Sequence, residues 1–122
     1  MTEADMREPT FWLLTALTEG PQHGYALLQA IDRLSDGRVR LRPGSLYGML
    51  DRLAALGLVE DTGTETVDGR QRRYYDLTEQ GTAALAGQAE RMQANATRAA
   101  ERLRARAAEA PRLFDTASPE QA

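Results

Sequence analysis

Apolar residues at helical spacing single out the stretch from Leu41 to Gly57 as the segment around which the chain is organised. They recur three and four positions apart, which is the spacing of a helix that buries one stripe of its surface. Pro43 suits the first helical position, where a missing amide proton costs nothing, and Gly57 suits the position just beyond the last turn. The stripe consists of Leu46, Met49, Leu50, Leu53 and Leu56.

The opposite face of this predicted helix is polar, and several arginines precede the helix in the sequence. The first turn of a helix offers free amide groups and the positive end of the helix dipole to phosphates, and small side chains there leave room for base edges. The arrangement is therefore typical of a DNA-reading helix, although an ordinary amphipathic core helix has the same pattern. The face carries Ser45, Gly48, Asp51 and Arg52, with Tyr47 at its edge, and the arginines are Arg38, Arg40 and Arg42.

Two helices and a short strand are predicted before this helix. The first helix spans Pro9 to Glu19, is apolar on nearly every side, and is expected to be buried against two surfaces. The second runs from His23 or Gly24 to Leu34, and the stretch from Arg38 to Leu41 alternates polar and apolar residues as a strand with one buried face does. These elements in this order match a helix-turn-helix unit. The buried stripe of the second helix is Tyr25, Leu27, Leu28, Ile31 and Leu34.

Two extended segments on either side of a tight turn predict a hairpin. They begin at Leu58–Asp61 and return through Arg72–Leu77, and the Asp68-Gly69 pair between them is a strong signal for a type I′ turn. A basic hairpin after a DNA-reading helix is the wing of a winged helix, where arginines contact phosphates or the minor groove. The alternative is a solvated edge strand that its charges protect. The tip and return strand carry Arg70, Gln71, Arg72 and Arg73.

The last helix is predicted to have Thr78 as its cap and to run from Glu79 to about Glu109, before Pro111 stops it. Its apolar residues alternate steps of four and three, as in a coiled coil, so a partner helix, most simply from a second copy, is expected. The seam consists of Leu85, Ala89, Met92, Ala96, Ala99 and Leu103. The predicted fold is thus mainly α with a small β-hairpin: a winged helix-turn-helix domain over 1–77, a dimerisation helix over 78–110 and a flexible tail over 111–122.

Composition limits the chemistry that the chain can carry. Its 122 residues include no cysteine and one histidine, which excludes disulfides, thiolate metal sites, cysteine nucleophiles and a conventional zinc site. We expect no metal, no cofactor and no enzyme activity, and we expect His23 to be a capping or surface residue. The net charge of −3 argues against nucleic acid unless the arginines converge on one face. The chain has no long apolar run and no signal peptide, which predicts a cytoplasmic protein without membrane segments.

Four short segments carry a resemblance to a known family. They are His23–Leu27 (HGYAL), Pro43–Tyr47 (PGSLY), Leu53–Val59 (LAALGLV) and Arg73–Gly81 (RYYDLTEQG). In this order and spacing they resemble the PadR family of bacterial transcriptional regulators, over about Pro9 to Gly81. The chain departs from the family pattern at Arg42, where a small capping residue is common, and at Gly48, which replaces the usual proline after the tyrosine.

The resemblance implies a homodimer that represses transcription by binding a palindromic operator, with half-sites about one helical turn apart. By motif position, Ser45 and Tyr47 would touch DNA and Arg73 would lie near phosphate. Local charge adds Arg42, Arg52, Arg70 and Arg72 as candidate DNA contacts. The resemblance also implies release by a small aromatic effector, with Phe11 and Trp12 as candidate contacts unless their rings belong to the core or to a dimer interface. The alternative function is a winged-helix protein-protein interaction module with weak or lost DNA binding.

Overall fold

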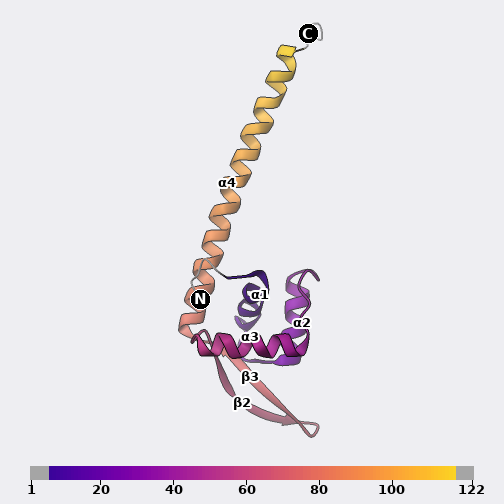
Figure 1. Ribbon diagram of the computed structural model, residues 1–122, viewed down its shortest axis with the longest axis vertical. Coiled ribbons are helices and arrows are strands. Elements are labelled where there is room, and N and C mark those ends of the chain that lie inside the picture. Colours follow the sequence, from indigo (N-terminus) through magenta and orange to yellow (C-terminus); the bar gives the residue numbers. More distant parts are fainter. Residues whose placement is uncertain (1–5, 118–122) are drawn as a thin grey trace. The chain divides into compact units, whose positions relative to one another are not determined.

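The computed structural model describes residues 6–117 of the chain, and the side chains of residues 6–109. In order, the elements are α1 (Glu8–Leu17), β1 (Gln22–His23), α2 (Gly24–Leu34), α3 (Pro43–Ala55), β2 (Val59–Val67), β3 (Arg70–Leu77) and α4 (Glu79–Ala117) (Figure 1). The strands form an antiparallel sheet in the order β1-β3-β2. The chain separates into two compact units, one that ends at Gln88 and one that begins at Ala89.

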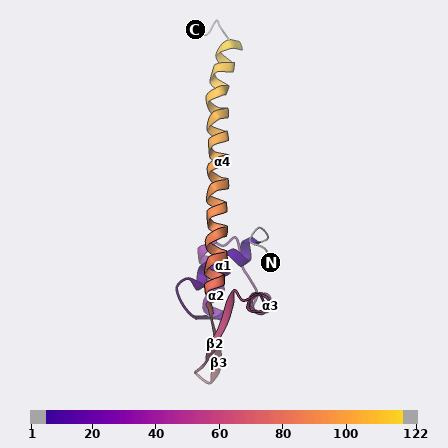
Figure 2. The ribbon, with the colours of Figure 1, turned by 90° about the vertical axis from the view of Figure 1, so that its left-hand side faces the viewer.

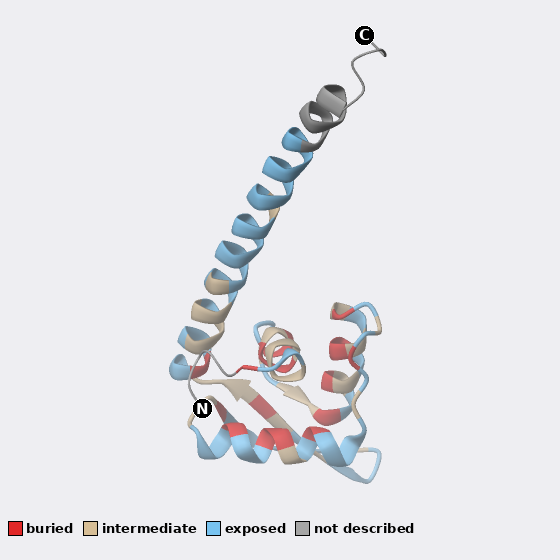
Figure 3. Cartoon of the chain, turned by 45° about the horizontal axis from the view of Figure 1, so that its top comes forward, coloured by how far each residue is buried: buried red, intermediate tan, exposed pale blue. Residues whose placement is uncertain are grey.

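The first unit has one hydrophobic core, to which α1, α2, α3, β2 and β3 contribute (Figure 3). The helix α1 packs against both α2 and β3, which confirms the prediction that it is buried against two surfaces. The hairpin of β2 and β3 projects beyond α1, α2 and α3 in both ribbon views (Figures 1 and 2). This is the predicted winged helix-turn-helix, mainly α with a small hairpin. The largest fully buried side chains are Leu13, Leu14, Leu17, Leu27, Ile31, Leu46, Leu50 and Val59.

The predicted strand over Arg38–Leu41 is wrong. Burial does alternate there, with Val39 buried between two exposed arginines, but the segment has no strand partner. Its backbone is held locally, because the Val39 amide donates to the Ser35 hydroxyl oxygen at 3.0 Å. The third strand is instead β1, whose two residues pair with Tyr74 and Tyr75 of β3.

Two apolar side chains that were predicted to be buried are exposed. Tyr25 is 65% exposed, because the stripe that α2 turns toward the core runs through Gly24, Leu27, Ala30 and Ile31 instead. Leu56 is 45% exposed because it is the cap residue at which the chain leaves α3. The rest of the α3 stripe is buried, and Gly57 ends the helix with a φ of +79°.

The predicted turn and cap after α3 are confirmed. Asp68 and Gly69 both have positive φ, at +51° and +76°, as a type I′ turn requires. The Thr78 hydroxyl oxygen accepts the Gly81 amide at 3.0 Å and so caps α4. Gly81 lies against Leu58, the residue just before β2, since a Cβ there would be 2.0 Å from the carbonyl oxygen of Leu58.

The helix α4 continues through Ala117, so the prediction that Pro111 stops it is wrong. A proline removes one hydrogen bond of a helix, and the turns on both sides can continue past it. The last five positions of the expected tail, 118–122, lie outside the described residues. No helix among residues 6–117 combines the length and the apolar character that a membrane crossing requires.

Candidate nucleic-acid interface

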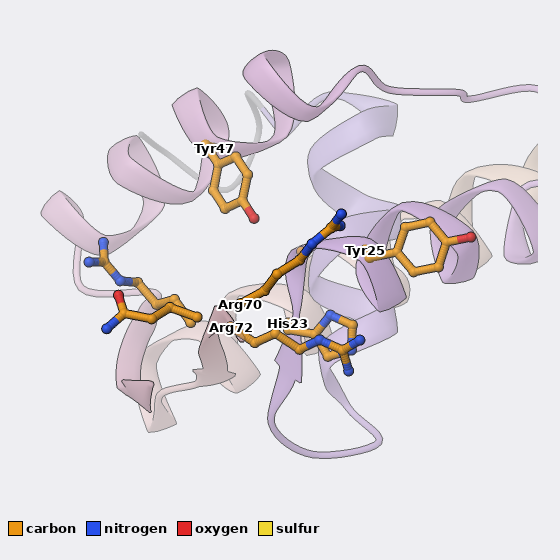
Figure 4. Close-up of a pocket in the computed structure, with 8 residues that line it drawn as sticks. His23, Tyr25, Tyr47, Arg70 and Arg72 are labelled. Atoms are coloured by element: carbon orange, nitrogen blue, oxygen red, sulfur yellow. The ribbon is translucent and has the colours of Figure 1, made fainter. Parts of the chain in front are cut away.

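A pocket of about 410 Å³ lies where the start of α2, the second turn of α3 and the start of β3 come together (Figure 4). It gathers four of the predicted contact residues, which come from α3 and from the wing. Figure 4 shows the Tyr47 ring projecting from α3 into this space. We call it the wing pocket, and its lining residues are His23, Gly24, Tyr25, Tyr47, Arg70, Gln71, Arg72 and Arg73.

The arginines of the first unit differ in whether their charge is already paired. Arg38 pairs with Glu8 at 3.1 Å, Arg40 with Asp32 at 3.5 Å, and Arg73 with Asp61 at 3.3 Å. Within the described residues, the other predicted contact arginines make no ion pair. They are Arg42, Arg52, Arg70 and Arg72.

Arg73 is held on the hairpin by two partners. Its pKa is raised, first by a side-chain hydrogen bond to Tyr75 and then by nearby charges that include Asp61. Asp61 lies at a bulge in β2, where its carboxylate also accepts the Gly63 amide at 2.9 Å. The guanidinium of Arg73 therefore lines the wing pocket with part of its hydrogen-bonding capacity already used.

His23 is one of the residues that line the wing pocket. Its ring meets Tyr74 edge to face, with centroids 5.4 Å apart. Burial lowers the pKa of His23, and the charge of Arg72 lowers it further against an opposing effect of Glu65. The neutral imidazole is thus favoured near pH 7. His23 occupies the N-cap position of α2 without a side-chain capping bond, so the capping alternative is wrong.

Ser45 and Arg52 line a second pocket, between the start of α1 and α3, together with Arg7. The predicted contacts on α3 are therefore divided, with Tyr47 beside the wing and Ser45 and Arg52 beside α1. Arg42 is the N-cap residue of α3 and makes no capping bond with its side chain, as expected for arginine.

The aromatic pair of α1 packs on the core. The rings of Phe11 and Trp12 meet edge to face with centroids 5.0 Å apart, and both are half-buried against the core residues. The indole N–H of Trp12 donates to a carboxylate oxygen of Glu8 at 3.1 Å. Neither ring lines the two pockets described above.

Sequence reasoning missed the part of the wing pocket that comes from the start of α2. Tyr25 was predicted to lie in the buried stripe of the second helix, His23 was expected to be a capping or surface residue, and Gly24 was given no role. A signal was present in the sequence, because Gly24 stands in the first turn of the predicted second helix, where glycine is unfavourable. Among the described residues, no group of three or more His, Asp or Glu side chains could hold a metal ion.

Comparison with known proteins places this geometry in a family. Residues 13–87 match the model of the transcriptional regulator PadR-like family. The transcriptional regulator Rv3488 of Mycobacterium tuberculosis is 44% identical over 63 residues, which are 52% of this chain and 55% of that protein. The chain spans between 21% and 67% of the length of the curated relatives that it matches.

Solved structures show the same fold. A PadR family transcription regulator from Clostridium difficile R20291 has a TM-score of 0.67 at 18% identity, covering 80% of this chain and 99% of that one. The structure of Bacillus subtilis PadR in complex with operator DNA has a TM-score of 0.59 at 20% identity, covering 66% of this chain and 46% of that one. Because the family match extends over more than half of the sequence, this chain belongs to the PadR-like family of transcriptional regulators.

Proposed function

We propose that this protein is a DNA-binding transcriptional regulator that reads its operator with α3 and holds the flanking phosphates with the wing. One observation carries the proposal: the wing pocket brings Tyr47 of α3 beside Arg70 and Arg72, whose charges are not paired within the described residues. Unpaired guanidinium groups on a projecting hairpin are suited to phosphate oxygens, and α3 offers the side chains for base contacts. The convergence of these arginines offsets the net charge of −3.

The proposed regulator acts as a homodimer that represses transcription from a palindromic operator. Support comes from the seam of α4, where Met92 is 43% exposed and Leu103 is 66% exposed. Ala96 and Ala99 between them are exposed too and would allow a second helix to approach closely, whereas Leu85 already packs on the core of the first unit. A second copy would bury this apolar stripe and pair two wing pockets with two half-sites.

A small aromatic effector is the proposed signal for release, and it would contact the parts of Phe11 and Trp12 that their packing on the core leaves exposed. The coupling would run through α1, because α1 packs against α2 and β3, which both line the wing pocket. Trp12 is the only tryptophan, so its fluorescence reports binding at this place directly. Quenching by small aromatic acids that also weaken DNA binding would support the effector, and quenching without that effect would refute the coupling.

A second candidate is a protein-protein interaction module that uses the exposed seam of α4 and binds DNA weakly or not at all. The acidic net charge and the exposed side chains of Met92 and Leu103 favour it. The two candidates differ in one measurement, which is the affinity of the intact full chain for duplex DNA.

Fluorescence anisotropy with duplex DNA from the region upstream of the protein's own gene tests the proposal. We expect the inverted repeat in that region to bind at least about a thousandfold more tightly than a scrambled duplex of the same length. Sedimentation of the complex gives the number of chains on each duplex, and two are expected. If a folded, dimeric protein binds no duplex at low salt, DNA binding is refuted and the interaction module remains.

A further inference from the structure

We infer that Gly24 is a positioning residue for Tyr47: its lack of a side chain lets the phenol ring pack on the start of α2 and face the wing pocket. The expected effect of this contact on DNA affinity rests on the proposed function. The packing itself is a property of the folded chain and can be measured without DNA.

The contact between these two residues is closer than any other residue at position 24 would permit. A Cβ built on Gly24 would lie 2.3 Å from the hydroxyl oxygen of Tyr47 and 2.9 Å from the ring carbon that carries it. Real Cβ atoms essentially never lie within 3.0 Å of a non-bonded heavy atom from a residue elsewhere in the chain. An alanine at position 24 and the present position of Tyr47 are therefore incompatible.

Backbone conformation does not account for the glycine. Positive φ is found at Gly37 and Gly57 but not at Gly24, which is the first residue of α2. Alanine would be the better residue in a helix, since glycine loses more conformational freedom on folding. The close approach of Tyr47 is thus the feature of this position that requires a glycine.

Of the two partners in this contact, the ring is the one that can move. The backbone at Gly24 follows directly from β1, which pairs with β3, and Leu27 on the next turn of α2 is fully buried. Tyr47 is 43% exposed, and its hydroxyl makes no hydrogen bond within the described residues. A methyl group at position 24 would therefore displace the phenol from the wing pocket and leave the fold in place.

The displaced ring would take the phenol of Tyr47 away from Arg70 and Arg72. Tyr47 lines the same pocket as Arg70 and Arg72, and its free hydroxyl can donate to a phosphate oxygen held by those guanidinium groups. Moving the ring should thus weaken operator binding about as much as removing it. Two of the segments that carry the family resemblance, HGYAL and PGSLY, meet at this contact.

A double-mutant cycle on operator affinity tests the inference. Gly24→Ala and Tyr47→Ala are each expected to weaken binding by a factor on the order of ten, and the double variant is expected to bind no more weakly than Tyr47→Ala alone. Wild-type affinity in Gly24→Ala would overturn the inference. So would a second loss of similar size when Gly24→Ala is added to Tyr47→Ala, because the effect would then not act through the ring.

Nuclear magnetic resonance separates this inference from the proposed function. In the free wild-type protein, the α-protons of Gly24 are expected to show nuclear Overhauser effects to the Tyr47 ring. In Gly24→Ala, the single α-proton of the alanine should show no such effect, because the ring has moved away. Gly44→Ala is the matched control, since it also adds a methyl group in the first turn of a helix but meets nothing within 4 Å. If the wild type lacks these effects, the inference fails whether or not DNA binds, whereas a protein that shows them and ignores every duplex refutes the proposed function alone.

Discussion

Replacing Arg72 by alanine is expected to reduce the salt dependence of DNA binding by a calculable amount. Arg72 lines the wing pocket, lies opposite Glu65 across the hairpin, and makes no ion pair within the described residues. A cation that neutralises one phosphate of duplex DNA contributes about 0.9 to the slope of log affinity against log salt. Arg72→Ala should therefore lower that slope by about 0.9 for each chain bound to the duplex.

The same substitution counts the chains on the operator. Between roughly 50 mM and 200 mM salt, the ratio of wild-type to variant affinity should fall by about 3.5-fold if one chain binds. If two chains bind, the slope should change by about 1.8 and the ratio by about 12-fold. Fluorescence anisotropy over a salt series measures both quantities, and a thermal melt followed by circular dichroism confirms that the variant is folded.

Arg40→Ala is the matched control for the loss of one positive charge. Arg40 is already paired with Asp32 and lines a different hollow at the end of α2, so its removal should leave the slope nearly unchanged. Arg73→Ala should have a smaller effect than Arg72→Ala, because Asp61 already holds the Arg73 guanidinium. An unchanged slope in Arg72→Ala, or an equal fall in Arg40→Ala, would refute the assignment of the wing pocket as the phosphate-binding surface.

Three further variants test other parts of the molecule. Gly81→Ala should lower the free energy of unfolding by about 1–3 kcal/mol, since its Cβ would lie 2.0 Å from the backbone carbonyl oxygen of Leu58; an unchanged urea midpoint would contradict this contact. The pKa of His23 is lowered from 6.5 by burial, so the unfolded chain takes up that proton first and the free energy of unfolding should fall as the pH drops below 6.5. Melts of His23→Gln over that range should lack this part of the fall. Met92→Glu combined with Leu103→Glu should give monomers in sedimentation and lose most operator affinity, and a variant that stays dimeric would place the dimer interface elsewhere.

Local patterns in the sequence were sufficient for most of the secondary structure. The stripe of Leu46, Met49, Leu50 and Leu53 predicted α3, the Asp68-Gly69 pair predicted the turn of the wing, and Thr78 predicted the start of α4. Each of these signals acts over a few residues, through hydrophobic periodicity, positive φ or a capping hydrogen bond. The family resemblance rested on the same short segments.

Partners far apart in the sequence were decided by packing alone. The alternation at Arg38–Leu41 suggested a strand, but a strand also needs a partner strand, and the packing of the domain decides which segment obtains one. The edge of β3 pairs with Gln22 and His23 instead. The ion pair between Arg38 and Glu8 joins residues 30 positions apart, and no local pattern shows which arginines are paired and which are available to a ligand. The contact of Gly24 with Tyr47 is of the same kind. Sequence periodicity determines which face of an element is apolar, whereas the distances between side chains of different elements arise only when those faces pack together.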